Sequence, residues 1–382
     1  MNELAKFKVV GFDLDYTLAR YTSAMFDFAL EHMVEFIKSE IPEKFHELIS
    51  VKPSEKVKNF LHKGWVYDSQ QNFYIWLDVK VEKNVNSSKV KWIAFSDKDF
   101  TNNESEIEKY YPNLDFPFTE RLLFKQQIDN WSVTKLGMHH VIENDFLLPY
   151  FYIHLILLRI LPDLTTFSEL SLRKLLNSAW SSWLSPKKHE IDHWKILDLE
   201  KYVHKLPEQF LDFMTSSCDS QPKFLLTNAG PIYAVRILKF LFGSEWYQLF
   251  RCIIFRSRKP GFFTKSDSFI RINNDTFQPI MSTSKILLRQ NGKYGGGFYM
   301  IGSTRPLVEA FEKDLGSKIE DHEILYFGDS VISDINSSPW STCYVDSVEA
   351  PEFCDKTTSI LDAVVESKCS YKTTDFTKFD AI

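Results

Sequence analysis

The sequence predicts an α/β protein with a doubly wound parallel sheet and a large inserted cap domain that is mainly helical. Short apolar segments, each ending in acidic or polar residues, alternate with helical patterns, as in parallel sheets covered by helices. Roughly 200 residues separate the first such segment from the second, far more than one strand crossover needs. We therefore expect a first core part at residues 1–24, the cap at 25–198 and a second core part at 199–382.

Short apolar runs predict the strands of the core, and residues typical of helix ends predict its helices. Ser303 or Thr304 can cap a helix whose end is marked by Gly316, a residue favoured just after a helix. Leu307, Phe311 and Leu315 recur at helical spacing between them and predict one buried face. The predicted strands are 7–12, 223–226, 252–255, 324–327 and 342–345, with a further helical pattern through 235–242. Together these elements indicate a Rossmann-like core.

The predicted cap mixes short strands, at 71–77 and 92–95, with helices. Phe146–Leu161 is almost wholly apolar, but Pro149, His154 and Arg159 interrupt it. A membrane-spanning helix needs about 20 apolar residues. We therefore expect a buried helix of the cap rather than a membrane span.

Charge and cysteine content exclude several classes of protein. The net charge of −6 gives no electrostatic footprint for nucleic acid, which is bound largely through clustered Lys and Arg. The five cysteines are scattered and contain no CxxC pair, so neither a disulfide framework nor a zinc cluster is expected. The first residues lack the apolar run of a signal peptide, so we expect a cytoplasmic location. The oligomeric state stays open.

Acidic and polar residues gather at the ends of the predicted strands. Because ligands bind at the carboxyl ends of parallel strands, residues from four separated segments are expected to form one site. Two aspartates after a strand are also common in simple turns. Four carboxylates in one place, however, would repel one another unless a cation lay among them. The expected site residues are Asp13, Asp15, Thr227, Asn228, Lys259, Asp329 and Asp334.

Magnesium is the expected cofactor of this site. Mg²⁺ takes oxygen ligands from one or two carboxylates and from phosphate groups. No cluster of His and Cys favours a softer metal. His189–His193 spells HExxH, a zinc motif when it lies on a buried helix, but polar, turn-like residues precede it. We therefore favour magnesium over zinc.

Four motifs together resemble a known signature. DxDxT from Asp13, Thr227-Asn228, Lys259 and the GDxxxxD that ends at Asp334 resemble the motifs of the haloacid dehalogenase superfamily. GFDLDYTLARY, LEKYVHKLP and RKPGFF resemble more narrowly the cytosolic purine 5′-nucleotidase and 5′-nucleotidase domain-containing family. The resemblance covers the core, about half of the chain. It implies a haloacid-dehalogenase-like sheet and a phosphatase activity.

The resemblance also implies roles for individual residues. Asp13 would be the nucleophile that forms an aspartyl-phosphate, and Asp15 would act as general acid and then as general base. Thr227 and Asn228 would hold phosphoryl oxygens, and Lys259 would offset their charge. Transport ATPases of the superfamily carry Thr where this chain has Asp15, so fast hydrolysis of the phosphoenzyme is expected.

The metal ligands implied by the resemblance are Asp13, Asp329 and the backbone carbonyl of Asp15. Asp334 would be a supporting carboxylate. The implied function is a magnesium-dependent phosphate-monoester hydrolase that acts on a nucleoside 5′-monophosphate. The family commonly has Ser where this chain has Ala229, and the base-reading residues of its cap are absent from LLNSAWSSWLSPKK. Base specificity and effectors are therefore not predicted.

Two alternatives stay open at the level of sequence. One is a phosphatase for another phosphate monoester, such as a sugar phosphate or a phosphoprotein. The other is a non-catalytic protein that keeps the fold in order to bind nucleotides or partners. The enzyme is favoured because Asp15, Lys259 and Asp334 are all retained, and a simple binding protein would not need them.

Overall fold

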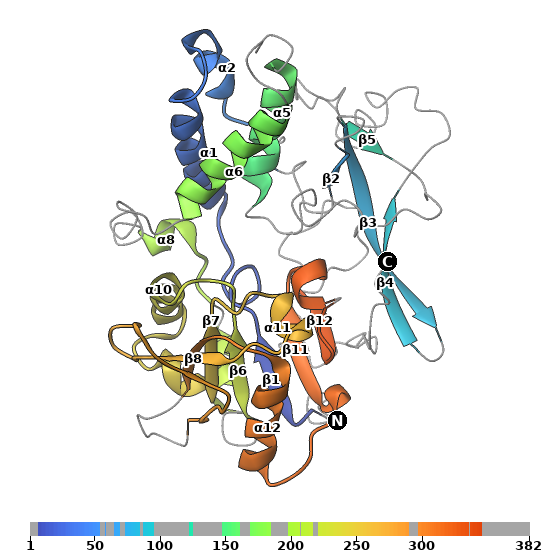
Figure 1. The fold of residues 1–382 in the computed structure, drawn as a ribbon, viewed down its shortest axis with the longest axis vertical. Coiled ribbons are helices and arrows are strands. Elements are labelled where there is room, and N and C mark those ends of the chain that lie inside the picture. The colour runs from blue at the N-terminus through green and yellow to red at the C-terminus, as the bar shows by residue number, and fades with distance from the viewer. Residues whose placement is uncertain are drawn as a thin grey trace. The chain divides into compact units, whose positions relative to one another are not determined.

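The chain forms two compact units in the computed structural model (Figure 1). One comprises residues up to Arg20, Val81–Val90 and the chain from Val203 onward, and the other comprises Tyr21–Lys80 and Lys91–Tyr202. Compactness alone does not show where a domain folds independently, so the boundaries expected from the sequence remain a proposal. The structure describes residues 7–53, 58, 65–68, 73–84, 87–94, 122–124, 147–160, 169–184, 198–206, 208–216, 221–289, 297–335 and 337–345.

The core is an eight-stranded sheet in the order β12-β11-β1-β6-β7-β10-β8-β9. The first six strands in that order are parallel, which confirms the predicted α/β class with a mainly parallel sheet. Strand β1 lies between β11 and β6, so the chain order reverses beside it. The strands are β1 (Val9–Phe12), β6 (Lys223–Leu226), β7 (Cys252–Phe255), β8 (Phe269–Ile272), β9 (Pro279–Thr283), β10 (Phe298–Ile301), β11 (Ile324–Gly328) and β12 (Ser341–Tyr344).

The other end of the sheet differs from the prediction. Strands β8, β9 and β10 were not predicted, and β8 and β9 run antiparallel to their neighbours. Strand β9 is a sheet edge whose residues are mostly exposed, so it lacks the apolar pattern that marks a buried strand. The predicted parallel sheet therefore continues into an antiparallel edge formed by β8 and β9.

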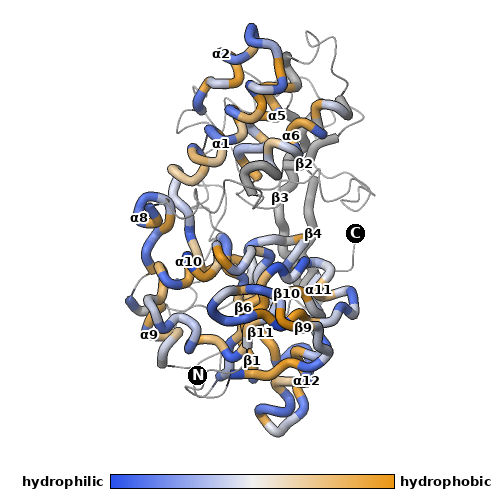
Figure 2. Tube along the Cα trace, turned by 60° about the vertical axis from the view of Figure 1, so that its left-hand side comes forward, coloured by the Kyte–Doolittle hydropathy of each residue, from blue (hydrophilic) through white to orange (hydrophobic). Residues whose placement is uncertain are grey.

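Helices α10 (Pro231–Phe242) and α12 (Thr304–Leu315) connect parallel strands in opposite directions. The first crosses from β6 to β7, and the second crosses back from β10 to β11. Because such crossovers are almost always right-handed, helices that cross in opposite directions cover opposite faces of the sheet. Figure 2 shows hydrophobic and hydrophilic residues alternating along α12, as expected for a helix with one buried side.

Helix α12 follows its predicted pattern with two differences. Gly316 has the left-handed backbone expected after a helix, at φ 66°, and Leu307 and Phe311 are buried. Leu315, the last residue of the helix, is instead 38% exposed. Ser303 occupies the capping position, but its hydroxyl donates to the carbonyl of Asp267 at 3.1 Å rather than capping the helix.

One face of the sheet has an aromatic core. Phe224 of β6 packs against Tyr326 of β11, Phe311 of α12 and Trp340. Gly11 of β1 lies directly beneath it, since a Cβ atom at Gly11 would fall 2.1 Å from the Phe224 ring. The glycine is therefore required by the close approach of this ring.

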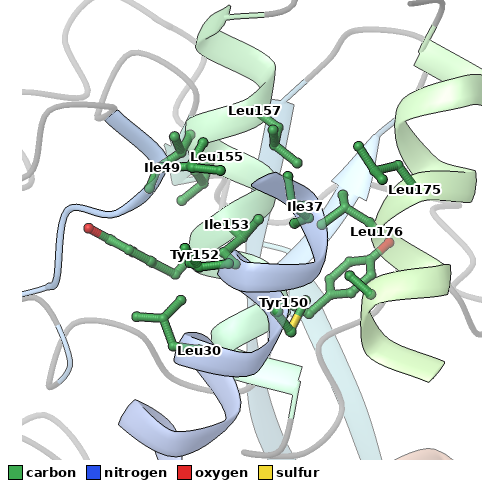
Figure 3. Close-up of a cluster of buried hydrophobic side chains, with 14 of the residues drawn as sticks. Leu30, Ile37, Ile49, Tyr150, Tyr152, Ile153, Leu155, Leu157, Leu175 and Leu176 are labelled. Carbon is green, nitrogen blue, oxygen red and sulfur yellow. The ribbon is translucent and has the colours of Figure 1, made fainter. Parts of the chain in front are cut away.

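The second unit has a helical core of its own. The described helices that contribute to this core are α1 (Ser23–Lys38), α2 (His46–Ile49), α5 (Leu148–Ile160) and α6 (Glu169–Leu184), with a short turn η2 (Glu43–Phe45). Figure 3 shows side chains from α1, α2, α5 and α6 directed into one apolar cluster. Helix α5 falls within the apolar segment expected to be a buried helix, and its described side chains are buried, which confirms that expectation. Among the described residues, no helix has both the length and the apolar character needed to cross a membrane.

Four strands form a second sheet, in which β2 is antiparallel to β3 and β5 is parallel to it. The strands expected at 71–77 and 92–95 correspond to β3 and β4, which are longer. These strands are β2 (Trp65–Asp68), β3 (Phe73–Asn84), β4 (Ser87–Ala94) and β5 (Leu122–Phe124). The remaining short elements are α8 (Leu199–Tyr202), α9 (Glu208–Ser216), η8 (Trp246–Leu249), α11 (Gly261–Thr264), η9 (Asp321–Glu323) and η10 (Val331–Ile335).

The first part of the unit that holds the eight-stranded sheet ends at Arg20 and its last part begins at Val203, and the two segments are joined by hydrogen bonds. The N–H of His204 donates to the carbonyl of Arg20 at 2.9 Å. The N–H of Thr22 donates to the carbonyl of Tyr202 at 3.0 Å, and its hydroxyl donates to the carbonyl of Lys201 at 2.7 Å. The long insertion therefore begins and ends at neighbouring points.

Gly11→Ala is expected to lower the free energy of unfolding by about 1–3 kcal/mol, because the added methyl group overlaps the Phe224 ring. Gly261→Ala is the control: its new methyl group would meet only the flexible Lys265 side chain, at 3.6 Å, and we expect a change within about 0.5 kcal/mol. Urea unfolding of both variants measures the difference. Equal stabilities would contradict the close packing of β1 on β6.

Candidate active site

Asp13 and Asp15 lie in a tight turn at the carboxyl end of β1. The N–H of Asp13 continues the ladder to β11 by donating to the carbonyl of Phe327 at 2.9 Å. The chain then turns back, because the carbonyl of Leu14 accepts the N–H of Leu18 at 2.9 Å. Asp13 is buried and Asp15 is half-buried. The turn therefore places one carboxylate inside the protein and one at its surface.

Asp329 and Asp334 follow the carboxyl end of β11, and both are buried. The wide turn η10 brings Asp334 back onto the strand, where the N–H of Ser330 donates to its Oδ2 at 3.2 Å. A Cβ atom at Gly328 would lie 2.4 Å from the Cβ of Asp334. The glycine of the GDxxxxD motif therefore makes room for its last aspartate.

Thr227 and Asn228 follow β6, and their neighbour Lys259 comes from the loop after β7. The Asn228 side chain binds this loop: Oδ1 accepts the N–H of Lys259 at 2.7 Å and the hydroxyl of Ser257 at 2.9 Å. Its Nδ2 donates to the Lys259 carbonyl at 3.1 Å. The Thr227 hydroxyl accepts the N–H of Ala229 at 3.0 Å. One amide side chain thus holds the backbone that carries Lys259.

The ammonium group of Lys259 lies between two carboxylates. Nζ is 2.9 Å from Asp13 Oδ1 and 2.6 Å from Asp334 Oδ1, and the lysine side chain is only 2% exposed. Nζ also donates to the hydroxyl of Tyr326 at 2.9 Å. The sequence predicted that a cation would have to separate these carboxylates, and the Lys259 ammonium is one such cation.

Burial changes the ionisation of this cluster. Burial raises the pKa of Asp13 to about 7; Lys259 opposes this shift, and the Asp334 and Asp15 carboxylates add to it. Burial alone would lower the pKa of Lys259, but the Asp13 and Asp334 carboxylates outweigh it and hold that pKa above its ordinary value. Lys259 therefore stays charged, while the surroundings of Asp13 disfavour its negative form.

The donor set fits a hard divalent cation. Asp13, Asp329 and Asp334 each offer a buried carboxylate oxygen, and these three oxygens lie within 4.8 Å of one another. Carboxylate oxygens are the ligands that Mg²⁺ and Ca²⁺ prefer. Asp13 pairs with Lys259 through Oδ1, whereas both oxygens of Asp334 accept hydrogen bonds, Oδ1 from Lys259 and Tyr326 and Oδ2 from the N–H of Ser330. Asp13 and Asp329 are therefore better placed than Asp334 to bind a cation directly. A cation beside Asp13 would also favour its charged form.

Sequence comparison places the chain in a family. A family model described as the 5′ nucleotidase family matches residues 2–348. The chain belongs to the 5′ nucleotidase family. Human 5′-nucleotidase domain-containing protein 2 is 23% identical over 339 residues, which cover 86% of this chain and 57% of that protein. Human 5′-nucleotidase domain-containing protein 1 is 27% identical over 157 residues, which cover 39% of this chain and 32% of that protein.

The chain spans about half the length of 5′-nucleotidase domain-containing protein 2 from human and from rat. A structure from Bacillus subtilis described as a HAD-hydrolase bound to magnesium aligns over 92% of this chain and 93% of that one, at 12% identity and a TM-score of 0.29. So low a score supports no argument about this chain. Membership of the 5′ nucleotidase family therefore rests on the sequence match.

Sequence reasoning missed three side chains of this family member's site. The Tyr326 hydroxyl contacts Lys259 and Asp334, and the Tyr233 hydroxyl on α10 donates to Asp15 Oδ1 at 3.2 Å. Ser257 supports Asn228. The apolar residues around Tyr233 and Tyr326 gave no signal, although Tyr326 lies two residues before the GD pair and therefore shares a strand face with Gly328. The HExxH segment lies outside the described residues.

Lys259→Met is expected to lower the free energy of unfolding in chelator by about 3–5 kcal/mol, because it leaves buried Asp13 and Asp334 without their counterion. Lys318→Met is the matched control, since Lys318 also pairs with a carboxylate but is 87% exposed. Solvent screening makes that pair weak, so its loss should leave stability nearly unchanged. Chemical unfolding compares the two, and a Lys259→Met protein as stable as the control would contradict the buried ion pairs.

Proposed function

We propose that this protein is a magnesium-dependent phosphate-monoester hydrolase that works through an aspartyl-phosphate on Asp13 and acts on nucleoside 5′-monophosphates. The observation that carries the proposal is the buried cluster of Asp13, Asp329 and Asp334 at the carboxyl ends of neighbouring strands, with Lys259 paired to the first and the last of them. A structural role alone does not account for so many buried charges, because burying each one is costly. Membership of the 5′ nucleotidase family supports the same reaction class.

In the first step, a carboxylate oxygen of Asp13 attacks the phosphorus atom, and the bond from phosphorus to the ester oxygen breaks. The leaving alcohol takes a proton from Asp15. In the second step, water attacks the phosphorus of the aspartyl-phosphate and gives a proton to Asp15, which releases phosphate and restores Asp13. Asp15 suits this exchange because it is half-buried, at the surface end of the same turn.

Thr227, Asn228 and Lys259 are proposed to hold the phosphoryl group. Asn228 is exposed, and only one of its two amide hydrogens has a hydrogen-bond partner among the described residues, so the other is available to an oxygen of the substrate. Thr227, the preceding residue, is buried. Lys259 supplies the charge that offsets the phosphoryl oxygens.

Asp13 and Asp329, with the backbone carbonyl of Asp15, are the proposed ligands of Mg²⁺, and Asp334 supports them. Bound Mg²⁺ would neutralise negative charge on the phosphoryl oxygens and orient the phosphate. The protein's own contribution is to keep both ligand carboxylates buried and close together before substrate arrives.

A nucleoside 5′-monophosphate is the favoured substrate, because the family model and the relatives' names point to nucleotides. A different phosphate monoester and a non-catalytic binding role remain the alternatives. The family commonly has Ser at the position of Ala229, so this chain lacks one hydroxyl near the proposed phosphate site. The acidic site residues are all retained. The cytoplasmic location stays a prediction from the sequence.

Phosphate release from an aryl phosphate, and from nucleoside 5′-monophosphates, is expected to require magnesium and to stop in chelator. Magnesium is also expected to raise the melting temperature, because a ligand that binds only the folded state stabilises it by mass action. Asp329→Asn should lose most of this stabilisation. Full activity in chelator would contradict the metal, and nucleotide binding without phosphate release would favour the non-catalytic alternative.

Asp13→Asn is expected to abolish turnover, because an amide cannot form the acyl phosphate. The variant should melt no lower than wild type in chelator, since the buried surroundings disfavour the charged form of Asp13. It should also gain less stability from magnesium. Asp314→Asn, at an exposed position of α12, is the control. Measurable turnover, or equal destabilisation with and without magnesium, would show that Asp13 is not the nucleophile.

A further inference from the structure

Tyr326 places a hydroxyl group inside the charged cluster. Its oxygen lies 2.9 Å from Lys259 Nζ, 3.0 Å from Asp334 Oδ1 and 3.2 Å from the carbonyl oxygen of Leu226. A phenol has one hydrogen, so it accepts the N–H of Lys259 and donates to only one of the other two oxygens at a time. Tyr326 is fully buried, so water does not take over any of these contacts.

Aromatic packing holds this hydroxyl in place. The Tyr326 ring stacks on Phe224 with centroids 6.2 Å apart, and it meets Phe263 and Trp340 edge-on at 5.8 and 5.9 Å. These rings come from β6, α11 and the segment before β12, and Tyr326 itself lies in the middle of β11. A group held on a strand by three rings is more rigid than one on a loop.

The three hydrogens of the Lys259 ammonium are all in use. They point to Asp13 Oδ1, Asp334 Oδ1 and the Tyr326 hydroxyl. Nζ lies 5.5 Å from the centroid of the Tyr326 ring but only 2.9 Å from its hydroxyl, so it sits beyond the hydroxyl and not over the ring face. A phosphoryl oxygen can therefore gain a hydrogen bond from Lys259 only when one of these three contacts is released.

The three contacts differ in how readily they can be released. Tyr326 is held by its ring neighbours, and Asp334 is held by the N–H of Ser330 and by its contact with Gly328. Asp13, by contrast, loses its negative charge when it accepts the phosphoryl group, and its attraction for the ammonium falls at the moment when the phosphoryl oxygens arrive.

We propose that Tyr326 is a positioning residue for Lys259: its hydroxyl and Asp334 hold the ammonium group at two points, so that the N–H shared with Asp13 is the one that turns to a phosphoryl oxygen. This rests on the proposed function, because it assumes that a phosphoryl group binds beside Asp13. Tyr326 touches neither substrate nor metal in this scheme and acts only through Lys259.

Tyr326→Phe tests the proposal, because it keeps the ring and removes only the hydroxyl. Without that support the ammonium group is less well directed, so kcat/KM for a phosphate monoester should fall about tenfold or more, mainly through kcat. The dissociation constant of inorganic phosphate, measured by calorimetry with magnesium present, should rise about fivefold or more. The phosphate titration does not depend on turnover.

Tyr299→Phe is the matched control. Tyr299 is a buried tyrosine of the same sheet, and its hydroxyl accepts the N–H of Leu287 at 2.7 Å and lies 3.3 Å from the Leu287 carbonyl, away from the charged cluster. Both variants should melt at similar temperatures, and only Tyr326→Phe should change kcat/KM and phosphate affinity.

Several results would overturn the proposal. Unchanged or tighter phosphate binding by Tyr326→Phe would mean that the tyrosine contact is the one released. A Tyr326→Phe protein that melts far below Tyr299→Phe, or does not fold, would assign the hydroxyl a structural role. Wild-type protein that binds phosphate but hydrolyses no ester would contradict the proposed function alone, whereas wild-type protein that binds no phosphate would contradict this inference as well.

Discussion

The buried ammonium group of Lys259 is the interaction on which the arrangement of the site depends. Asp13 and Asp334 come from loops that are far apart in the sequence, and their charges would drive them apart in a buried setting. One lysine, within hydrogen-bond distance of both, allows the two loops to approach each other before any metal binds. The ammonium group can do this only if the lysine is accurately positioned, and the side-chain amide of Asn228 holds its backbone by two hydrogen bonds.

The sheet explains how so few residues assemble such a site. Strand β1 lies between β11 and β6, so the loops that follow these three strands are neighbours at the edge where the chain order reverses. Glycine is needed at two places for close approach: Gly11 beneath Phe224, and Gly328 beneath Asp334. The polar site and the aromatic core are thus built on the same strands, and Tyr326 belongs to both.

The sequence predicted most of this core because its signals are local. Strands β6 and β7 match their predicted bounds, and Gly316 ends α12 as its residue type suggests. The antiparallel edge strand β9 was missed because its residues are mostly exposed and show no apolar periodicity. Tyr326 and Tyr233 were missed for another reason: an isolated tyrosine in an apolar run looks like core, and only the folded chain reveals what its hydroxyl meets.

The hydrogen bonds that join Arg20 to His204 and Thr22 to Tyr202 explain how the sheet can accommodate so long an insertion. Because the insertion starts and ends at adjacent points, the core needs only a short turn to close across them. The entropic cost of closing a loop grows slowly with its length, so a long insertion at this place destabilises the core little more than a short one. An insertion at such a junction can therefore be lengthened or shortened with little effect on the stability of the sheet.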